Sequence, residues 1–170
     1  LDHNNVQVAM PGQQCCGMPL VDAGDYAGAE TKMMHNLRML SSWVDDGYDI
    51  VVAQPTCALM IREEYLRNSR DQDLASKVSR NTYEFGHYLV SMARADLLTR
   101  EFSNALGRVA VHVACHTRAQ AVGNNSVRIL GIVPDTQVEV TESCSGHDGF
   151  WGISKEYFPL SLKVGQKLFN

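Results

Sequence analysis

The chain has 170 residues, 45% of them hydrophobic and 20% charged, a composition typical of one globular domain or two small packed domains. Its 15 basic and 19 acidic residues give a net charge of −4, and no lysine- and arginine-rich block could follow a phosphate backbone. Nucleic acid is therefore not an expected partner. The longest apolar runs fall far short of the roughly 20 residues that a membrane-spanning helix needs.

Strands and helices are expected to alternate along the chain. Alternating or continuous apolar residues predict strands at 6–10, 49–53, 108–114 and 137–140. Apolar residues at helical spacing predict helices at 25–47, after Cys57 through Glu63 and Tyr65, within 67–81, at 85–99, at 115–129 and through most of the chain after residue 149, where Pro159 kinks the helix or begins a new one. This order favours an α/β fold with a mainly parallel sheet and flanking helices, in which functional loops gather at the strand ends.

The cysteines are the residues most indicative of function. There are five, an odd number, with two adjacent and the others scattered: Cys15, Cys16, Cys57, Cys115 and Cys144. Small secreted scaffolds instead carry an even disulfide framework. We therefore expect a reducing compartment, in which the thiols serve as metal ligands or redox groups.

The two halves of the chain also repeat one pattern. A strand at 6–10 leads to Cys15-Cys16-Gly17, and a strand at 137–140 leads to Cys144-Ser145-Gly146, while Cys57 and Cys115 each follow another strand. The repeat predicts two pseudo-repeated modules, 1–106 with a helical insertion and 107–170. The first would lack its first strand and the second its last strand. Together with the start at Leu1 rather than Met, this predicts an interior fragment, truncated at both ends.

The adjacent thiols of Cys15 and Cys16 suit a metal cluster better than a mutual disulfide, whose eight-membered ring strains the peptide bond. Gly17 lets the backbone wrap closely around such a group, and Cys57 would supply a third ligand. The alternative for Cys57 and Cys115 is that they are small buried hydrophobic residues at strand ends.

Four motifs together resemble a known family. They are Gln14-Cys15-Cys16-Gly17-Met18-Pro19, Pro55-Thr56-Cys57, Ala114-Cys115-His116 with Arg118-Ala119-Gln120, and Cys144-Ser145-Gly146-His147-Asp148-Gly149. They are similar to the cysteine-rich CCG-domain family, which includes subunits of heterodisulfide reductase and of anaerobic glycerol-3-phosphate dehydrogenase. The resemblance covers nearly the whole chain.

The resemblance implies a cofactor and a set of ligands. The family has two modules, each with a cysteine, a later CCG and a C-x-x-C, and it can bind non-cubane 4Fe-4S iron–sulfur clusters. By position, Cys15, Cys16 and Cys57 would be ligands in the first module, and Cys115 and Cys144 in the second. With at most three cysteines per module, the isolated chain is also expected to be obtainable without metal.

Two departures from the family pattern affect these sites. Gln54 stands where the first cysteine of C-x-x-C would be, and Ser145 replaces the second cysteine of CCG. Because a serine alkoxide is so basic, the second module would need a different centre or help from His116, His147 or Asp148.

Histidine offers further candidate groups near Cys115. His112 and His116 are four residues apart, but His112 lies in a predicted strand, so a hydrogen-bonded core histidine is an equal alternative. His116 is a candidate metal ligand or proton relay, and otherwise a helix-capping residue. Arg118 and Gln120 would pair with an anionic cluster or face solvent.

The resemblance implies an oxidoreductase subunit rather than a stand-alone enzyme. It would relay electrons from flavin-containing dehydrogenase subunits of the glycerol-3-phosphate type to a quinone or disulfide acceptor, in the cytoplasm and peripheral to the inner face of the cell membrane. One alternative is a metal-free or zinc-bound interaction module with structural cysteines. Another is a thiol–disulfide enzyme that uses Cys15 or Cys16.

Overall fold

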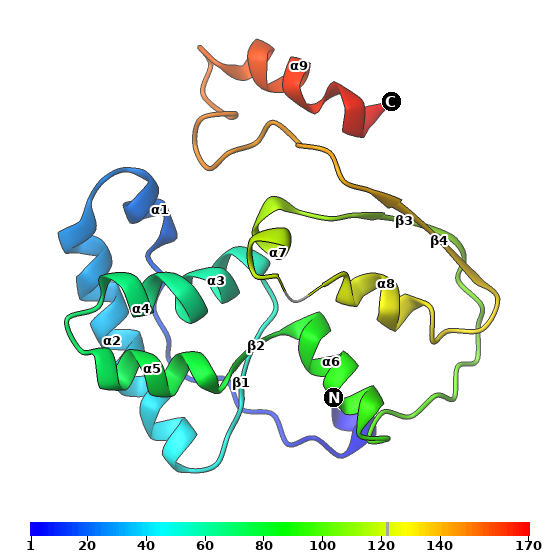
Figure 1. Ribbon diagram of the computed structural model, residues 1–170, viewed down its shortest axis with the longest axis horizontal. Helices are drawn as coiled ribbons and strands as arrows, with labels where there is room; N and C mark the ends of the chain where they lie inside the picture. The colour runs from blue at the N-terminus through cyan, green and yellow to red at the C-terminus, as the bar shows by residue number, and fades with distance from the viewer. Residues whose placement is uncertain (122) are drawn as a thin grey trace. The chain divides into compact units, whose positions relative to one another are not determined.

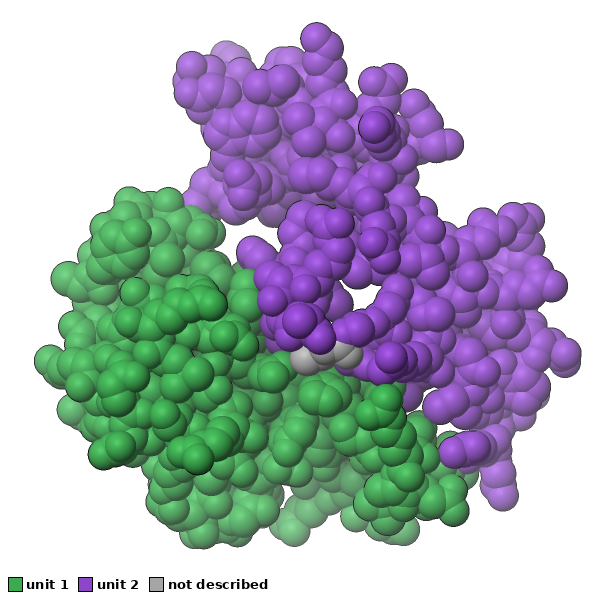
Figure 2. All heavy atoms as spheres, in the orientation of Figure 1, with its two compact units in different colours: residues 1–99 green, residues 100–170 purple. Residues whose placement is uncertain are grey.

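The structure, a computed structural model, describes residues 1–121 and 123–170 (Figure 1). The chain forms two compact units, residues 1–99 and 100–170, which Figure 2 colours separately. Each unit contains a two-stranded parallel sheet with helices. The predicted α/β class with parallel strands is therefore confirmed, although the strands lie in two sheets rather than one. The assignment of 1–106 and 107–170 to two CCG modules stays a prediction.

Helices form most of the first unit. They are η1 (Asp2–Asn4), α1 (Met18–Asp22), α2 (Tyr26–Asp45), α3 (Pro55–Leu59), η2 (Met60–Glu64), α4 (Tyr65–Asn68), α5 (Gln72–Arg80) and α6 (Phe85–Arg94). The long helix predicted at 25–47 is confirmed as α2, and the Asp25 side chain caps it by accepting a hydrogen bond from the Gly28 N–H at 2.9 Å. Ala29, Met33 and Leu37 recur at helical spacing and are almost fully buried in the core.

A single helical run continues from α3 through η2 into α4, which confirms the helix predicted through Glu63 and Tyr65 but begins it earlier, at Pro55, so that Cys57 lies in the helix and not before it. Its middle part, η2, is a π-helical turn, a wider turn that absorbs one extra residue. Tyr65 follows Cys57 by eight residues, so the extra residue leaves the two on one face of the run, about two turns apart.

The first sheet pairs β1 (Ile50–Val52) with β2 (Thr82–Glu84) in parallel, with Ile50 opposite Thr82. Ile50 and Val52 pack against the core that α2 helps to form. β1 was predicted, whereas β2 was not, because three residues between two helices are too few to show an alternating pattern.

The strand predicted at 6–10 is wrong. No residue of that stretch pairs with another strand in the described part of the chain, and Val8 and Met10 are 59% and 88% exposed. Alternation of side chains favours an extended backbone, but a strand also needs a neighbour that accepts its hydrogen bonds. The helix predicted at 85–99 ends early, at Arg94.

In the second unit, β3 (Gly107–His112) pairs in parallel with β4 (Thr136–Thr141), as predicted. The helix predicted at 115–129 is instead α7 (Cys115–Ala119) and α8 (Asn125–Leu130), and Val122, which falls within the predicted range, lies outside the described residues. Residues 150–157 form turns rather than a helix, and Pro159 lies in the first turn of α9 (Phe158–Phe169). Among the residues described, no helix is both long and apolar enough to span a bilayer.

Candidate thiol and metal site

Two buried polar side chains hold the loop that carries Cys15 and Cys16. The Asn36 amide of α2 accepts a hydrogen bond from the Gln14 N–H at 2.9 Å and donates to the Gln14 and Cys15 carbonyls, both at 3.2 Å. It also donates to the Tyr65 hydroxyl at 3.1 Å, which in turn donates to the Cys16 carbonyl at 3.0 Å. Asn36 is 2% exposed and Tyr65 0%. The network fixes the backbone on which the paired thiols stand.

Gly17 makes the turn from this loop into α1. Its φ of +93° lies in the left-handed region, which residues with a Cβ rarely adopt. A Cβ there would lie 3.5 Å from the Ala29 carbonyl oxygen, so sterics leave room and the backbone angle alone requires glycine.

Cys57 reaches the same place from another part of the chain. It lies in the first turn of α3, just after β1, and is half-buried beside the core. Its thiol interacts with that of Cys16, and the charges of Cys15, Cys16 and Cys57 all act on the Tyr65 hydroxyl. Three cysteines from two segments separated by about 40 residues in sequence therefore gather around one buried tyrosine.

The hydrogen bond between Cys16 and Cys57 shifts the pKa values of the two thiols in opposite directions. The Cys16 thiol donates a hydrogen bond that lowers the pKa of Cys57 from 9.0 to about 7. That same hydrogen bond, together with burial, raises the pKa of Cys16 far above its ordinary range. Burial likewise raises the pKa of Tyr65, which keeps its hydroxyl protonated and able to donate to the Cys16 carbonyl. Near neutral pH Cys57 is therefore the more acidic thiol of the pair and is partly ionised, whereas Cys16 stays protonated.

These residues match an iron–sulfur cluster in the type and proximity of their sulfur atoms. Thiolates are the usual ligands of such clusters, and none of the five cysteines is in a disulfide. The match is partial, because no three His, Cys, Asp or Glu side chains among residues 1–121 and 123–170 are grouped as a metal site. Cys15 is exposed, Cys57 is half-buried and Cys16 is buried, so the three thiols differ in their access to solvent.

The other two cysteines lie in the second unit. Cys115 begins α7 just after β3, and Cys144 follows β4, so both stand beyond the carboxyl ends of paired parallel strands. Both are exposed. Cys115 accepts a hydrogen bond from the Arg118 guanidinium at 3.8 Å, and Cys144 accepts one from the Gly146 N–H at 3.4 Å. The two thiols therefore share one sheet edge, and each has its own hydrogen-bond donor.

The histidine candidates take separate positions. His112 is exposed rather than in the core, and its Nε2 lies 2.8 Å from the Ser143 carbonyl oxygen. His116 is half-buried in α7, where its carbonyl accepts a hydrogen bond from Gln120, while His147 and Asp148 are exposed in the turn after Cys144. A role for His116 as a metal ligand stays a prediction.

Asn36 and Tyr65 are the site residues that the sequence did not single out. Each stands within an amphipathic helical pattern, where a polar residue normally faces solvent. Asn36 lies between the apolar residues Met33 and Leu40, on the buried side of α2, and this placement is the one available signal. Their partners are backbone carbonyls of a distant loop, which a local pattern does not reveal.

Comparison with known proteins bears on the same segment. Residues 1–62 match the family model of the CCG cysteine-rich domain. The resemblance predicted from the motifs is thereby confirmed, and the matched segment contains Cys15, Cys16 and Cys57. Cys115 and Cys144 lie outside it.

Two curated relatives are similar over most of the chain. Both are named as the same component of anaerobic glycerol-3-phosphate dehydrogenase, one from Escherichia coli strain K12 and one from Escherichia coli O157:H7. Each is 24% identical to this chain over 160 residues. The alignment covers 93% of this chain but only 40% of each relative, so the chain spans less than half their length. No solved structure matches the chain.

Proposed function

We propose that the chain belongs to an iron–sulfur electron-transfer subunit of an anaerobic dehydrogenase. The observation that carries the proposal is the meeting of Cys15, Cys16 and Cys57 around Tyr65, within the segment that matches the CCG cysteine-rich domain. The similarity to two relatives that are named as dehydrogenase subunits supports the assignment to a dehydrogenase. The electron donor would be a flavin-containing dehydrogenase subunit of the glycerol-3-phosphate type, and the acceptor a quinone or a disulfide. The subunit would work in the cytoplasm, peripheral to the inner face of the cell membrane.

Cys15, Cys16 and Cys57 would hold the cluster, which supplies one-electron chemistry when it is bound. Cys57 would be the first ligand to bind iron, because its lowered pKa of about 7 leaves a large thiolate fraction near neutral pH. Cys16 must release its proton before it can bind iron, so loading the site should release protons. Asn36 and Tyr65 would keep the loop backbone that carries Cys15 and Cys16 fixed.

Cys115 and Cys144, with His116 as a further candidate ligand, would form a second centre in residues 100–170. Arg118, which donates to Cys115, would offset negative charge there. Ser145 stands at the position of the missing cysteine and is a poor ligand for iron.

One observation favours a second candidate function, a redox dithiol. Cys16 and Cys57 interact as free thiols, and the low pKa of Cys57 gives it the character of an attacking thiolate. In that function Cys57 attacks a disulfide substrate and releases one substrate thiol. Cys16 then attacks the mixed disulfide, releasing the second thiol and leaving a Cys16–Cys57 disulfide. The substrate gains two electrons, and the two cysteines lose them.

Iron, acid-labile sulfide and zinc analysis of protein expressed and purified without oxygen separates these functions. The electron-transfer proposal predicts brown protein in which iron and sulfide are present in comparable amounts. Colourless protein with one zinc per chain would contradict it in favour of an interaction module. Colourless, metal-free protein whose Cys16–Cys57 disulfide forms and is reduced reversibly would contradict it in favour of the redox dithiol.

A further inference from the structure

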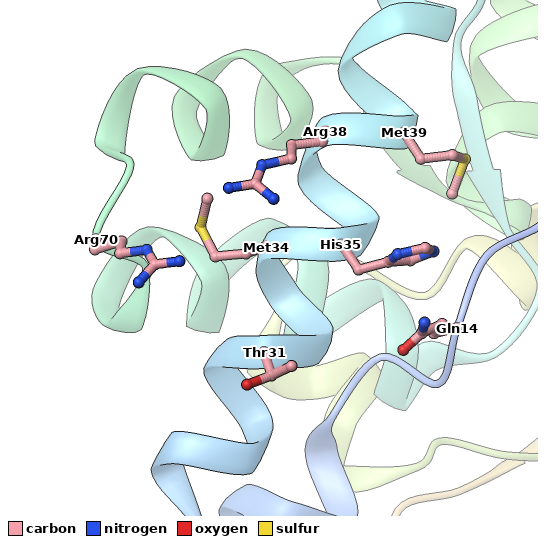
Figure 3. Close-up of a pocket in the computed structure, with 7 residues that line it drawn as sticks. All are labelled: Gln14, Thr31, Met34, His35, Arg38, Met39 and Arg70. Carbon is pink, nitrogen blue, oxygen red and sulfur yellow. The ribbon is translucent and has the colours of Figure 1, made fainter.

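A cavity of about 460 Å³ lies along α2, beside the loop that carries the paired cysteines (Figure 3). One wall is a face of α2, and the others come from that loop and from the turn between α4 and α5. The lining residues are Gln14, Thr31, Met34, His35, Arg38, Met39 and Arg70. No acidic side chain is among them.

The cavity is cationic in a chain of net charge −4. Figure 3 shows the guanidinium groups of Arg38 and Arg70 on the same side of α2, with the Met34 side chain between them. Arg38 is exposed and has no ion pair with any described residue. Arg70 contacts Glu30 at 3.6 Å, an exposed pair of the kind that contributes little. Both guanidinium groups are therefore available to an anion.

Hydrogen bonds within the first unit connect the segments that line the cavity. Ser69 is buried and donates a hydrogen bond to the Met34 sulfur at 3.5 Å, which ties the backbone next to Arg70 to α2. On the other side, Lys32 Nζ donates to the Gln14 side-chain oxygen at 3.0 Å, bringing a further positive charge close to the cavity. Lys32 and Arg38 thus stand on the long helix α2, and Arg70 stands in a short turn that Ser69 ties to α2.

We propose that this cavity binds a small organic anion, whose carboxylate or phosphate group is held by Arg38 and Arg70. The forked donors of arginine match the paired oxygens of both groups. The cavity volume leaves room for a short carbon body, with Met34 and Met39 as the apolar part of the lining. The proposal does not depend on metal binding by the cysteines.

The cavity also adjoins the thiol site through one residue. Gln14 lines the cavity with its side chain, and its backbone is hydrogen-bonded to Asn36, which holds Cys15 as well. Gln14 therefore joins the lining of the cavity to the loop that carries Cys15 and Cys16.

The test is a titration of the reduced, metal-free chain, followed by NMR, at constant ionic strength. Inorganic phosphate and succinate are the two probes, and they distinguish a phosphate from a carboxylate ligand. Saturable binding of either probe at one site is expected. Arg38→Gln and Arg70→Gln should each weaken it about tenfold or more, because each removes a charge-assisted hydrogen bond.

Arg80→Gln is the matched control, since Arg80 is another arginine of the same unit, whose Nε bonds to the Ser76 carbonyl outside the cavity. Affinity should stay within about twofold in this variant. The proposal is overturned if neither probe saturates, or if Arg80→Gln weakens binding as much as Arg38→Gln does. Circular dichroism of each variant checks that the fold is unchanged.

Discussion

Replacing Cys16 with alanine is expected to return the Cys57 thiol to ordinary acidity. The hydrogen bond from Cys16 is the largest cause of the lowered pKa of Cys57, so its loss should move that pKa from about 7 toward 9.0. At pH 7 the thiolate fraction of Cys57 would then fall from about one half to about one hundredth. Each remaining thiolate would be about 6–10 times more nucleophilic, which leaves a net slowing of about 5–8-fold at pH 7.

The assay is alkylation of the reduced, metal-free protein with iodoacetamide between pH 5.5 and 10, followed by mass spectrometry of the peptide that contains Cys57. In the parent protein the rate should rise with a midpoint near pH 7. In Cys16→Ala the midpoint should lie near pH 9, and the plateau rate should be higher.

Cys115→Ala is the matched control, because it removes a thiol from the second unit and should leave the Cys57 profile unchanged. If the midpoint of Cys16→Ala stays near 7, the acidity of Cys57 does not come from Cys16 and the described arrangement of the thiols is wrong.

Three substitutions test the packing that positions the site, each by urea denaturation of the reduced, metal-free protein. Asn36→Leu should lower the free energy of unfolding by about 2–3 kcal/mol, because it leaves the Gln14 N–H and two carbonyls without their partner, and a loss under 0.5 kcal/mol would refute that role. Gly17→Ala should lower the free energy of unfolding by about 1–2 kcal/mol, because alanine is strained at a φ of +93°. Gly12→Ala should lower it much less, because an added Cβ at Gly12 has no neighbouring atom within 4 Å, and equal losses would argue against backbone strain. Leu37→Ala, at a position that is 0% exposed, should cost about 2–5 kcal/mol, and Leu97→Ala, 65% exposed, should cost less than about 0.5 kcal/mol; similar values would contradict the described core.

The sequence predicts those parts of the fold that depend on local patterns. The period of the apolar residues and the cap at Asp25 predict α2 closely, and apolar runs predict β1, β3 and β4. The stretch 6–10 has the side-chain pattern of a strand, but pairing depends on a partner elsewhere in the chain, and none of the described residues provides one.

The site was predictable in its residue types and less so in its chemistry. The CCG motif and the position of Cys57 after a strand indicate that three thiols could meet, and the structure brings them together around Tyr65. The sequence does not reveal that Cys57 carries the acidic thiol, because this follows from a contact with Cys16 across the fold. The role of Asn36 likewise depends on a loop about 20 residues away in sequence.

The iron content of protein that lacks the second-unit cysteines shows whether Cys15, Cys16 and Cys57 bind the metal. Cys115→Ser/Cys144→Ser protein, reconstituted with iron and sulfide without oxygen, is expected to bind iron and to show the visible absorption of iron–thiolate bonds. Adding Cys57→Ser should remove most of both. Iron binding that is equal with and without Cys57, or absent from the background protein, would contradict the claim that Cys15, Cys16 and Cys57 hold the metal together.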